Sequence, residues 1–298
     1  MASKKFAVLG ATGQIGRVLS EELLRNGHKV RAIGRDAKKL DALRAKGAEI
    51  FSTGFENEVL LSEAFFGSDG VFVMLPPGYG VDDLGAYQDR TGETIRKAIE
   101  TSKVKKVVNL SSVGAHHPDK TGPIKGAYAQ EHRLNALPGT DVLHLRPAFF
   151  MQNFLFSIPA IKSKGAIASP IKADLPFWAV STNDIGKKAS EFLGGLGFKG
   201  KTVFEFVGPR QITYAKATQI LGKAIGKEDL KYEQLSYADQ EKGMIGAGMK
   251  PGVAKLMVEM HQATNDGLII PTQTLKEDHK GATTFESFAR EFAEAFGK

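Results

Sequence analysis

The sequence predicts an α/β fold, a doubly wound parallel sheet followed by a smaller C-terminal α/β lobe, on three observations. Short apolar runs alternate with helical patterns over the first half of the 298-residue chain. A glycine-rich turn joins the first apolar run to the first helical segment. After about Asn153 the alternation loosens and glycine-rich turns separate the remaining segments. Strands that alternate with helices in this way form parallel sheets with right-handed crossovers.

Apolar runs and helical periodicity predict the elements in order. Strands are expected at 6–9, 29–33, 49–51, 70–75 and 106–110. Helices are expected at 14–26, 38–45, 59–66 and 86–102, and in the second half at 183–193, 214–225 and 284–296. We therefore expect a dinucleotide-type domain over residues 1–155 and a smaller substrate-binding lobe over residues 156–298. Some segments of the lobe can instead pack with the first domain.

Composition limits the classes of function. The chain contains no cysteine, which excludes disulfides, thiolate metal sites and cysteine nucleophiles. The formal net charge is +7, but the lysines are spread along the chain and do not alternate with aromatic residues, so no nucleic-acid partner is expected. No apolar run approaches the ~18 residues of a membrane span, so we expect no membrane partner and a cytoplasmic location. The spacing His-Glu-x-x-His and other zinc patterns are absent, and no metal is expected.

The first strand is followed by a glycine-rich turn, Gly10-Ala11-Thr12-Gly13-Gln14-Ile15-Gly16. In such turns the first glycine permits the tight turn, the second lets the backbone approach a pyrophosphate, and the third lets the helix pack close to the strand. The N–H groups that open the helix then face the phosphates. Because strand, turn and helix occur in the required order, the sequence predicts a Rossmann-type domain that binds a dinucleotide. The expected contacts are Gly10, Thr12, Gly13, Gln14, Ile15 and Gly16.

The end of the second strand indicates which dinucleotide binds. A site for NAD usually has Asp or Glu there, to hold the ribose 2′-hydroxyl. Here Arg35 ends the strand and Lys39 follows one helical turn later, and both suit the 2′-phosphate of NADPH. Asp36 favours the opposite interpretation, because its carboxylate can accept a hydrogen bond from a ribose hydroxyl. We expect NADPH as the cofactor.

Several segments together resemble the NmrA-like group of atypical short-chain dehydrogenases/reductases. They are the glycine turn, Arg35, the segment Val107-Val-Asn-Leu-Ser-Ser-Val-Gly-Ala115 and the segment Leu145-Arg-Pro-Ala-Phe-Phe-Met-Gln-Asn153. The group includes NADPH-dependent quinone, triphenylmethane-dye and isoflavone-type reductases, and transcriptional co-regulators that bind the dinucleotide without known chemistry. The resemblance is strongest over residues 6–155. It continues at Asn183-Asp-Ile-Gly186 and Val207-Gly-Pro209.

This resemblance implies positions for the nicotinamide and the substrate. The nicotinamide is expected against the loop after the fourth strand and the end of the fifth, and the substrate beside the segment that begins at Pro147. The implied cofactor contacts are Leu75, Pro76, Pro77, Ser111 and Pro147. The implied substrate contacts are Phe149, Phe150, Asn153 and Trp178. Aromatic residues at such spacing also form hydrophobic cores, and this alternative stays open.

Two features depart from the family's pattern. Relatives often carry Gly-Asp after the third strand, near the adenine, where this chain has Gly54-Phe55. Phe55 is expected to stack on the adenine instead. Typical short-chain dehydrogenases use Tyr-x-x-x-Lys, in which the lysine lowers the pKa of the tyrosine. Here the residue four positions after Tyr128 is His132.

Many NmrA-like reductases have instead a lysine about four residues before a helix glutamate. If Glu131 is that glutamate, Ala127 occupies the lysine position; if the register slips by one, His132 and Tyr128 occupy the two positions. Lys125 is close but out of register. The candidate catalytic residues are therefore Tyr128, Lys125 and Ser112, with His117 as a further proton donor in a glycine- and proline-rich loop.

Two functions fit these residues. The first is an NADPH-dependent reductase that transfers hydride to a small apolar or aromatic acceptor, such as a quinone, enone or imine. The second is a non-catalytic sensor in which occupancy by NADP(H) changes the binding of a partner protein. The enzyme is the favoured interpretation, with a small-molecule substrate, and a homodimer is the candidate assembly.

Overall fold

The computed structural model describes residues 2–297, and its largest element is a sheet of seven strands. In chain order they are β1 (Lys5–Leu9), β2 (Lys29–Gly34), β3 (Glu49–Ser52), β4 (Gly70–Met74), β5 (Lys106–Leu110), β6 (Asp141–Pro147) and β10 (Lys201–Phe206). Neighbouring strands are parallel, in the order β10-β6-β5-β4-β1-β2-β3. The order reverses between β1 and β4, where such sheets bind ligands outside the carboxyl ends of their strands. The predicted α/β fold with a parallel sheet is confirmed.

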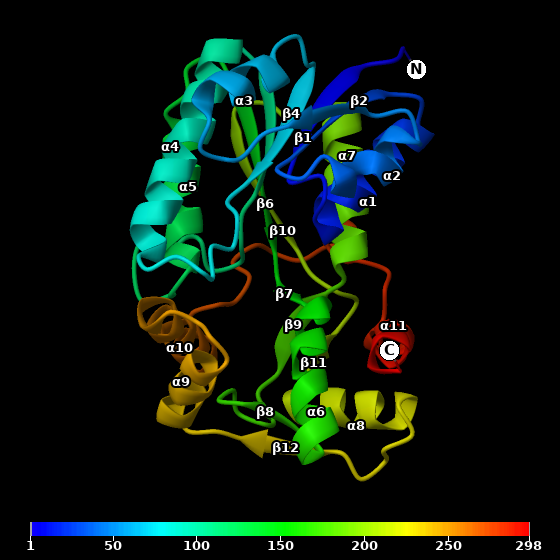
Figure 1. Ribbon diagram of the computed structural model, residues 1–298, viewed down its shortest axis with the longest axis vertical. Helices are drawn as coiled ribbons and strands as arrows, with labels where there is room; N and C mark the ends of the chain where they lie inside the picture. Colours follow the sequence, from blue (N-terminus) through cyan, green and yellow to red (C-terminus); the bar gives the residue numbers. More distant parts are fainter. Residues whose placement is uncertain (1, 298) are drawn as a thin grey trace.

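Helices cover both faces of this sheet (Figure 1). They are α1 (Gln14–Arg25), α2 (Asp41–Arg44) and α7 (Thr182–Gly195) on one side, and α3 (Glu58–Phe65), α4 (Leu84–Ser102) and α5 (Ile124–Asn135) on the other. Alternate residues of β1 enter two separate cores: Phe6 and Val8 pack with Leu19 and Leu23 of α1, whereas Ala7 and Leu9 enter the core under α3 and α4. A strand buried on both faces needs apolar residues at every buried position, as β1 has from Phe6 to Leu9.

Most of the expected elements agree with the structure to within two residues, but the helix expected at 38–45 does not form as one unit. It is a 3₁₀ turn, η1 (Lys38–Leu40), followed by the single turn of α2. The side chain of Asp36 closes a turn at the start of this segment, where its Oδ1 accepts a hydrogen bond from the backbone N–H of Lys38 at 3.0 Å.

Two elements from the second half of the chain belong with the large sheet. β10 forms its edge beside β6, and α7 packs on α1. The two helices approach so closely that a Cβ on Gly186 would lie 2.7 Å from Cβ of Val18. The division of the chain at residue 155 stays a prediction, but residues 182–206 lie with the domain that the sequence assigned to the first half.

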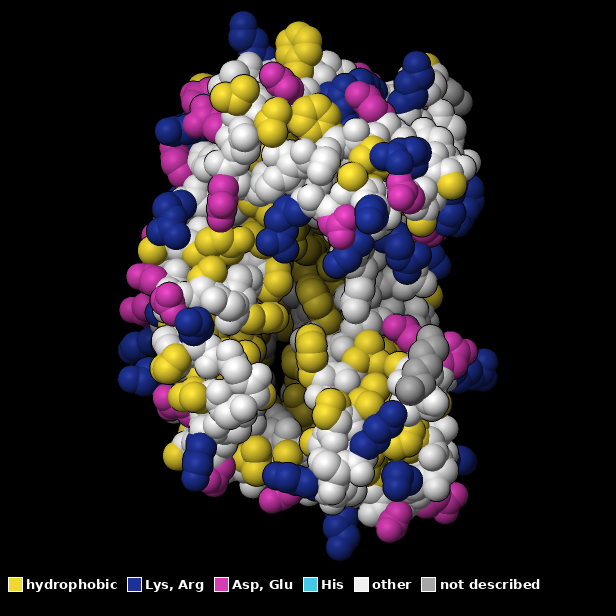
Figure 2. Space-filling model, viewed as in Figure 1, with side chains coloured by type: hydrophobic (Ala, Val, Ile, Leu, Met, Phe, Trp, Pro, Cys, Tyr) yellow, Lys and Arg dark blue, Asp and Glu magenta, His cyan; other side chains and the backbone are white. Residues whose placement is uncertain are grey.

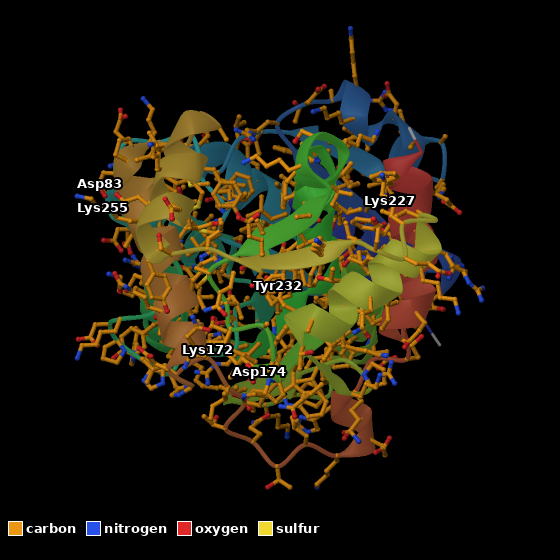
Figure 3. All side chains as sticks on the ribbon, turned by 90° about the horizontal axis from the view of Figure 1, so that it is seen from below. Asp83, Lys172, Asp174, Lys227, Tyr232 and Lys255 are labelled. Atoms are coloured by element: carbon orange, nitrogen blue, oxygen red, sulfur yellow. The ribbon has the colours of Figure 1, made fainter. Side chains whose placement is uncertain are left out.

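The smaller lobe lies below the large sheet in Figure 1. Its elements are β7 (Phe149–Phe150), η2 (Met151–Ser157), α6 (Ile158–Lys164), β8 (Ala166–Ser169), β9 (Phe177–Val180), β11 (Gln211–Ile212), α8 (Tyr214–Ala224), β12 (Lys231–Gln234), α9 (Tyr237–Gly246), α10 (Pro251–Asn265) and α11 (Phe285–Phe296). The strands among them form a three-stranded sheet, β11-β9-β7, and a two-stranded sheet, β12-β8. Figure 3 shows the lobe from below, with Tyr232 near its centre. The hydroxyl of Tyr232 hydrogen-bonds to the carbonyl oxygens of Ser169 (2.9 Å) and Ile171 (2.5 Å) and so ties β12 to the end of β8.

Residues 266–284, which we call the strap, connect α10 to α11 and pass beneath the large sheet (Figure 1). The strap includes the 3₁₀ turn η3 (Glu277–His279). Near its end, Asp184 of α7 accepts hydrogen bonds from the backbone N–H of Thr283 (2.7 Å) and from its hydroxyl (2.9 Å). The strap therefore holds the two halves of the molecule together through a carboxylate that is itself buried. Within the described residues, no helix has the length and apolar character needed to cross a membrane.

A buried histidine lies between β5, β6 and α5. Nδ1 of His144 is 3.1 Å from the amide nitrogen of Asn109, and its Nε2 is 2.9 Å from Oδ1 of Asn135. Both contacts suit the neutral ring, with the Asn109 amide donating to Nδ1 and Nε2–H donating to Asn135. Burial lowers the pKa of His144 from 6.5 to about 4, because the charged imidazolium loses its hydration.

We expect this histidine to make the free energy of unfolding depend on pH. Between pH 6.5 and 4 the unfolded chain binds a proton that the folded protein excludes, so stability is full above pH 6.5 and falls as the pH drops toward 4. A shift of this size corresponds to roughly 3 kcal/mol. Urea unfolding at pH 7 and pH 4.5 should show a smaller loss of stability in His144→Gln than in the unchanged protein. His132→Gln, at an exposed position of α5, is the control. An equal loss in all three proteins would contradict the prediction.

Candidate functional site

The turn between β1 and α1 has the backbone shape of a phosphate site. Gly10 has a φ of 75°, which favours glycine, and its carbonyl accepts a hydrogen bond from the N–H of Gly13 at 2.9 Å. A Cβ on Gly16 would overlap the same carbonyl group, lying 2.9 Å from its carbon. Gly13 is the N-cap of α1, and no side chain caps the first N–H groups of this helix. These N–H groups are therefore available to an anion.

Arg35 and Lys39 are exposed beside this turn, at the end of β2 and in η1. Within residues 2–297 neither side chain forms a salt bridge. Asp36 lies between them, and one of its oxygens is engaged with the backbone of Lys38. Two cations without carboxylate partners therefore lie at the position where a 2′-phosphate is expected, which supports the interpretation of this end as an NADP site.

The loop after β4 and the segment after β3 differ in exposure. Leu75 is half-buried, Pro76 is buried and Pro77 is exposed, so this loop presents a partly apolar surface at the carboxyl end of β4. Phe55 is only 9% exposed and packs in the core with Ile33. Its expected stacking on the adenine stays a prediction, and in this structure the ring serves as core.

The hydroxyl groups at the end of β5 are already engaged. Ser111 donates to Oε1 of Glu131 at 2.5 Å, and Ser112 donates to the carbonyl oxygen of Val113 at 2.9 Å. Each serine has a single hydroxyl proton, so in this arrangement both can only accept a further hydrogen bond. The roles of Ser111 as a cofactor contact and of Ser112 as a catalytic residue stay predictions, and a role as hydrogen-bond donor requires the hydroxyl proton to leave its present partner.

A buried ion pair lies behind Ser111. Glu131 is buried and binds Arg146 through two hydrogen bonds, from Nε at 2.8 Å and from Nη2 at 2.6 Å. His132 is exposed. Of the two registers that the sequence left open, the geometry favours the one in which Glu131 is the glutamate and Ala127 occupies the family's lysine position.

The candidate proton donors occupy different surroundings. The ring of Tyr128 is half-buried and packs against His132, with ring centroids 4.3 Å apart. Nζ of Lys125 is 3.5 Å from Glu259 of α10, and Nε2 of His117 is 3.1 Å from the carbonyl oxygen of Leu268. Lys125 and His117 are thus held by α10 and the strap. Tyr128 has no hydrogen-bond partner among the described residues.

The aromatic residues divide between the two halves of the molecule because strand residues alternate. β7 and β9 pair in parallel, Phe149 with Ala179 and Phe150 with Val180. Phe149 faces the core of the smaller lobe, where its ring contacts Phe154 and Phe177. Phe150 packs on the opposite side, against the core of the large sheet, and so does Trp178. Asn153 is exposed and Pro147 is buried. Phe150 and Trp178 are therefore the predicted substrate contacts that face the large sheet.

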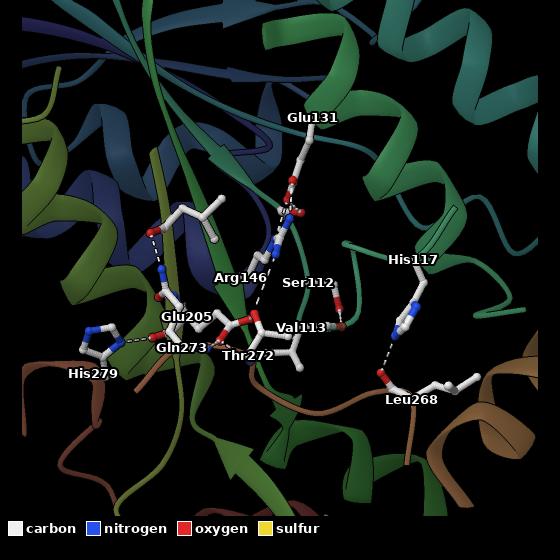
Figure 4. A network of polar contacts seen from close by, with 12 residues as sticks. Ser112, Val113, His117, Glu131, Arg146, Glu205, Leu268, Thr272, Gln273 and His279 are labelled. Atoms are coloured by element: carbon white, nitrogen blue, oxygen red, sulfur yellow. Dashed lines mark hydrogen bonds and ion pairs between the residues drawn. The ribbon is translucent and has the colours of Figure 1, made fainter. Parts of the chain in front are cut away.

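Sequence reasoning missed the buried charges below the sheet (Figure 4). Nη1 of Arg146 lies 4.0 Å from Oε1 of Glu205, which is fully buried at the end of β10. Glu205 in turn accepts hydrogen bonds from the backbone N–H groups of Thr272 and Gln273 in the strap, both at 2.7 Å. The sequence carries one signal for Glu205, a single charged residue between Phe204 and Phe206 in an otherwise apolar run. Its partners come from 67 and 68 residues away in sequence.

Figure 2 shows a hollow between the two halves of the molecule, walled mainly by hydrophobic side chains and with Lys and Arg side chains on its upper rim. Its position matches the carboxyl ends of the large sheet's strands, where the glycine turn, the loop after β4 and the end of β5 meet. An apolar hollow with cations at its rim suits a flat organic group joined to phosphates. Within residues 2–297, no three His, Asp or Glu side chains are grouped to hold a metal.

The fold and the phosphate turn together define a Rossmann-type protein with the geometry of a dinucleotide site. The chain belongs to the NmrA-like family, whose model matches residues 2–289. The NAD(P)H azoreductase of Xenophilus azovorans is 29% identical over 294 residues, covering 97% of this chain and 98% of the relative. A (4-alkanoyl-5-oxo-2,5-dihydrofuran-3-yl)methyl phosphate reductase of Streptomyces griseus is 27% identical, covering 97% and 98%. The structure of the Escherichia coli NADPH-dependent quinone oxidoreductase with NADPH has a TM-score of 0.81 at 21% identity, covering 96% and 99%, and shares the fold.

The glycine turn predicts two different consequences of adding a side chain. A Cβ on Gly13 would be 3.3 Å from the nearest atom, the carbonyl oxygen of Gly10, which the fold tolerates with a small adjustment, whereas Gly16 has no such room. We expect Gly13→Val to fold but to lose binding of a dinucleotide, because its branched side chain occupies the phosphate position. We expect Gly16→Ala to lower the melting temperature. Thermal unfolding and titration calorimetry with NADPH separate the two effects. Unchanged affinity in Gly13→Val would place the phosphates elsewhere.

Proposed function

We propose that this protein is an NADPH-dependent reductase of small apolar or aromatic acceptors, a class that includes quinones, enones and imines. Membership of the NmrA-like family supports this, as do the names of relatives that align over 97% of the chain, an NAD(P)H azoreductase and a butenolide phosphate reductase. The observation that carries the proposal is the uncapped N-terminus of α1, with the unpaired cations Arg35 and Lys39 beside it. A homodimer and a cytoplasmic location stay predictions from the sequence.

The residues present fit both phosphate-bearing parts of this cofactor. The free N–H groups of α1 bind the pyrophosphate, and Arg35 with Lys39 binds the 2′-phosphate. When bound, the cofactor supplies a hydride, so the protein's contribution is to orient it and to keep water out. The half-buried Leu75, Phe150 and Trp178 provide apolar surface for that purpose. The hydroxyl of Ser111 donates its hydrogen bond to Glu131. Its oxygen therefore serves as an acceptor for an N–H group, such as that of a carboxamide.

The acceptor also needs a proton, and the contacts of the candidate donors favour Tyr128 as the residue that binds the acceptor. It lies one helical turn before Glu131 on α5 and its hydroxyl is not committed to another described residue. Lys125 and His117 are tied to the smaller lobe, and Ser112 donates to Val113. Because His132 and not a lysine stands at the Tyr-x-x-x-Lys spacing, Tyr128 orients the acceptor and water completes the protonation.

The activity itself is tested by following NADPH oxidation with a panel of quinones, an azo dye and an α,β-unsaturated ketone. We expect turnover with at least one acceptor, and none when a saturated alcohol, which cannot accept a hydride, replaces it. Binding of NADPH without turnover of any acceptor would favour the alternative of a dinucleotide sensor. Failure to bind either NADPH or NADH would overturn the proposal.

Cofactor choice is predicted to depend on Arg35. A charge-assisted hydrogen bond contributes about 1.5–3 kcal/mol, so Arg35→Ala should weaken NADPH by roughly 10–100-fold. Affinity for NADH, which has no 2′-phosphate, should stay nearly unchanged. Arg25→Ala is the matched control, because Arg25 is an exposed arginine at the far end of α1 that pairs with Glu22 at 2.6 Å. Equal affinity of the unchanged protein for NADPH and NADH would refute this assignment.

Tyr128→Phe tests how the acceptor is protonated. General acid catalysis typically contributes about 10²–10⁴-fold, so we expect turnover to fall by less than this range if Tyr128 only orients the acceptor. Steady-state kinetics should be accompanied by a measurement of NADPH affinity, which we expect to be unchanged. A loss of about 10³-fold or more would make Tyr128 the acid. No change would place the acceptor elsewhere in the hollow.

A further inference from the structure

The buried charges behind Ser111 do not cancel. Two carboxylates, Glu131 and Glu205, flank one guanidinium, Arg146, and all three side chains are less than a tenth exposed. No other charged side chain of residues 2–297 forms a salt bridge with them. The network therefore carries one net negative charge inside the protein.

The protein holds these charges in fixed positions. Arg146 binds Glu131 through two of its nitrogens. Glu205 accepts two backbone N–H groups of the strap and the hydroxyl of Thr272 at 3.1 Å, so its charge is stabilised by dipoles of the main chain and not by a second cation. Dipoles of this kind compensate the cost of burial without neutralising the charge. The fold thus fixes the positions of all three side chains.

This charge lies at the nicotinamide end of the proposed site. Ser111 is the first residue after β5, and its hydroxyl donates a hydrogen bond to Glu131. In doubly wound sheets the second half of a dinucleotide lies over the carboxyl ends of the strands beyond the switch point, which here are β4 and β5. The adenine half lies over β1 and β2, where Arg35 is. The two ends of the site therefore have opposite electrostatic character.

We propose that the network of Glu131, Arg146 and Glu205 makes the bound cofactor a stronger hydride donor by favouring its oxidised form. This inference rests on the proposed function. The reduced nicotinamide ring is neutral, and after two electrons and a proton leave together as hydride the ring carries one positive charge. The acceptor gains the hydride and takes a proton from water. A fixed negative charge near the ring stabilises the charge that develops, without any rearrangement during the reaction.

The test compares the affinities for NADP⁺ and NADPH within each variant. Both forms carry the same phosphates, so the ratio of their dissociation constants, NADP⁺ over NADPH, isolates the charge on the ring. For a unit charge about 10 Å away at an effective dielectric constant of about 20, Glu205→Gln and Glu131→Gln should each raise this ratio by roughly 15-fold. Arg146→Gln removes the positive charge and should lower it. Titration calorimetry at pH 8 gives both constants.

Controls separate the electrostatic effect from damage to the fold. Asp184→Asn removes another buried carboxylate that holds the strap, but one on α7 beside α1, so its ratio should match that of the unchanged protein. In Glu131→Gln/Arg146→Gln the net charge stays the same, and the ratio should return toward the original value. Should Glu131→Gln fail to fold, Glu205→Gln carries the test.

The outcomes distinguish this inference from the proposed function. If the unchanged protein binds both forms and the ratio stays constant in the Glu→Gln variants, or if Asp184→Asn changes it equally, the network has only a structural role. If the unchanged protein binds neither form, the proposed function itself fails. A ratio that rises on removing a carboxylate and falls on removing Arg146 supports the inference, since loss of packing alone cannot give opposite signs.

Discussion

Both halves of this molecule depend on the ion pairs that the guanidinium of Arg146 forms. It binds Glu131 of α5, which in turn fixes the hydroxyl of Ser111 at the end of β5. On its other side it faces Glu205 at the end of β10, to which the strap is attached. Three strands of the sheet, one helix and the connection between the lobes therefore meet at one buried cation. Removing one member of a buried ion network commonly costs several kcal/mol, because the remaining charges are left without partners.

The sheet could be predicted from the sequence because its signals are local. An apolar run such as that of Phe6 to Leu9 is buried on both faces of the sheet. The glycine at position 16 is required by a close approach to Gly10, only six residues away. The exception in this part of the chain, the broken helix after β2, is local too. The carboxylate of Asp36 accepts a hydrogen bond from the backbone N–H two residues later and closes the turn that opens this segment.

The site could be predicted at its phosphate end and not at its reactive end, for a related reason. The glycine turn and Arg35 lie within 26 residues of each other, whereas the partners of Glu205 are 67 and 68 residues away and those of Lys125 lie on α10. Hydrogen bonds between distant segments leave no periodic trace in a sequence. The hydroxyls of Ser111 and Ser112 illustrate this, because their residue type suggested donors, and only their neighbours show that the protons are already committed.

The attachment of the strap also orders the events of folding. Glu205 lies at the end of the last strand of the large sheet, but the N–H groups that solvate its carboxylate belong to Thr272 and Gln273, close to the C-terminus. A chain that has emerged from the ribosome only as far as β12 contains every strand of the sheet and still lacks those donors. Burying the carboxylate in that state is unfavourable, so we expect the edge strand β10 to dock stably beside β6 only once Thr272 and Gln273 are present. A truncation after α10 would remove both donors and leave the carboxylate of Glu205 without them.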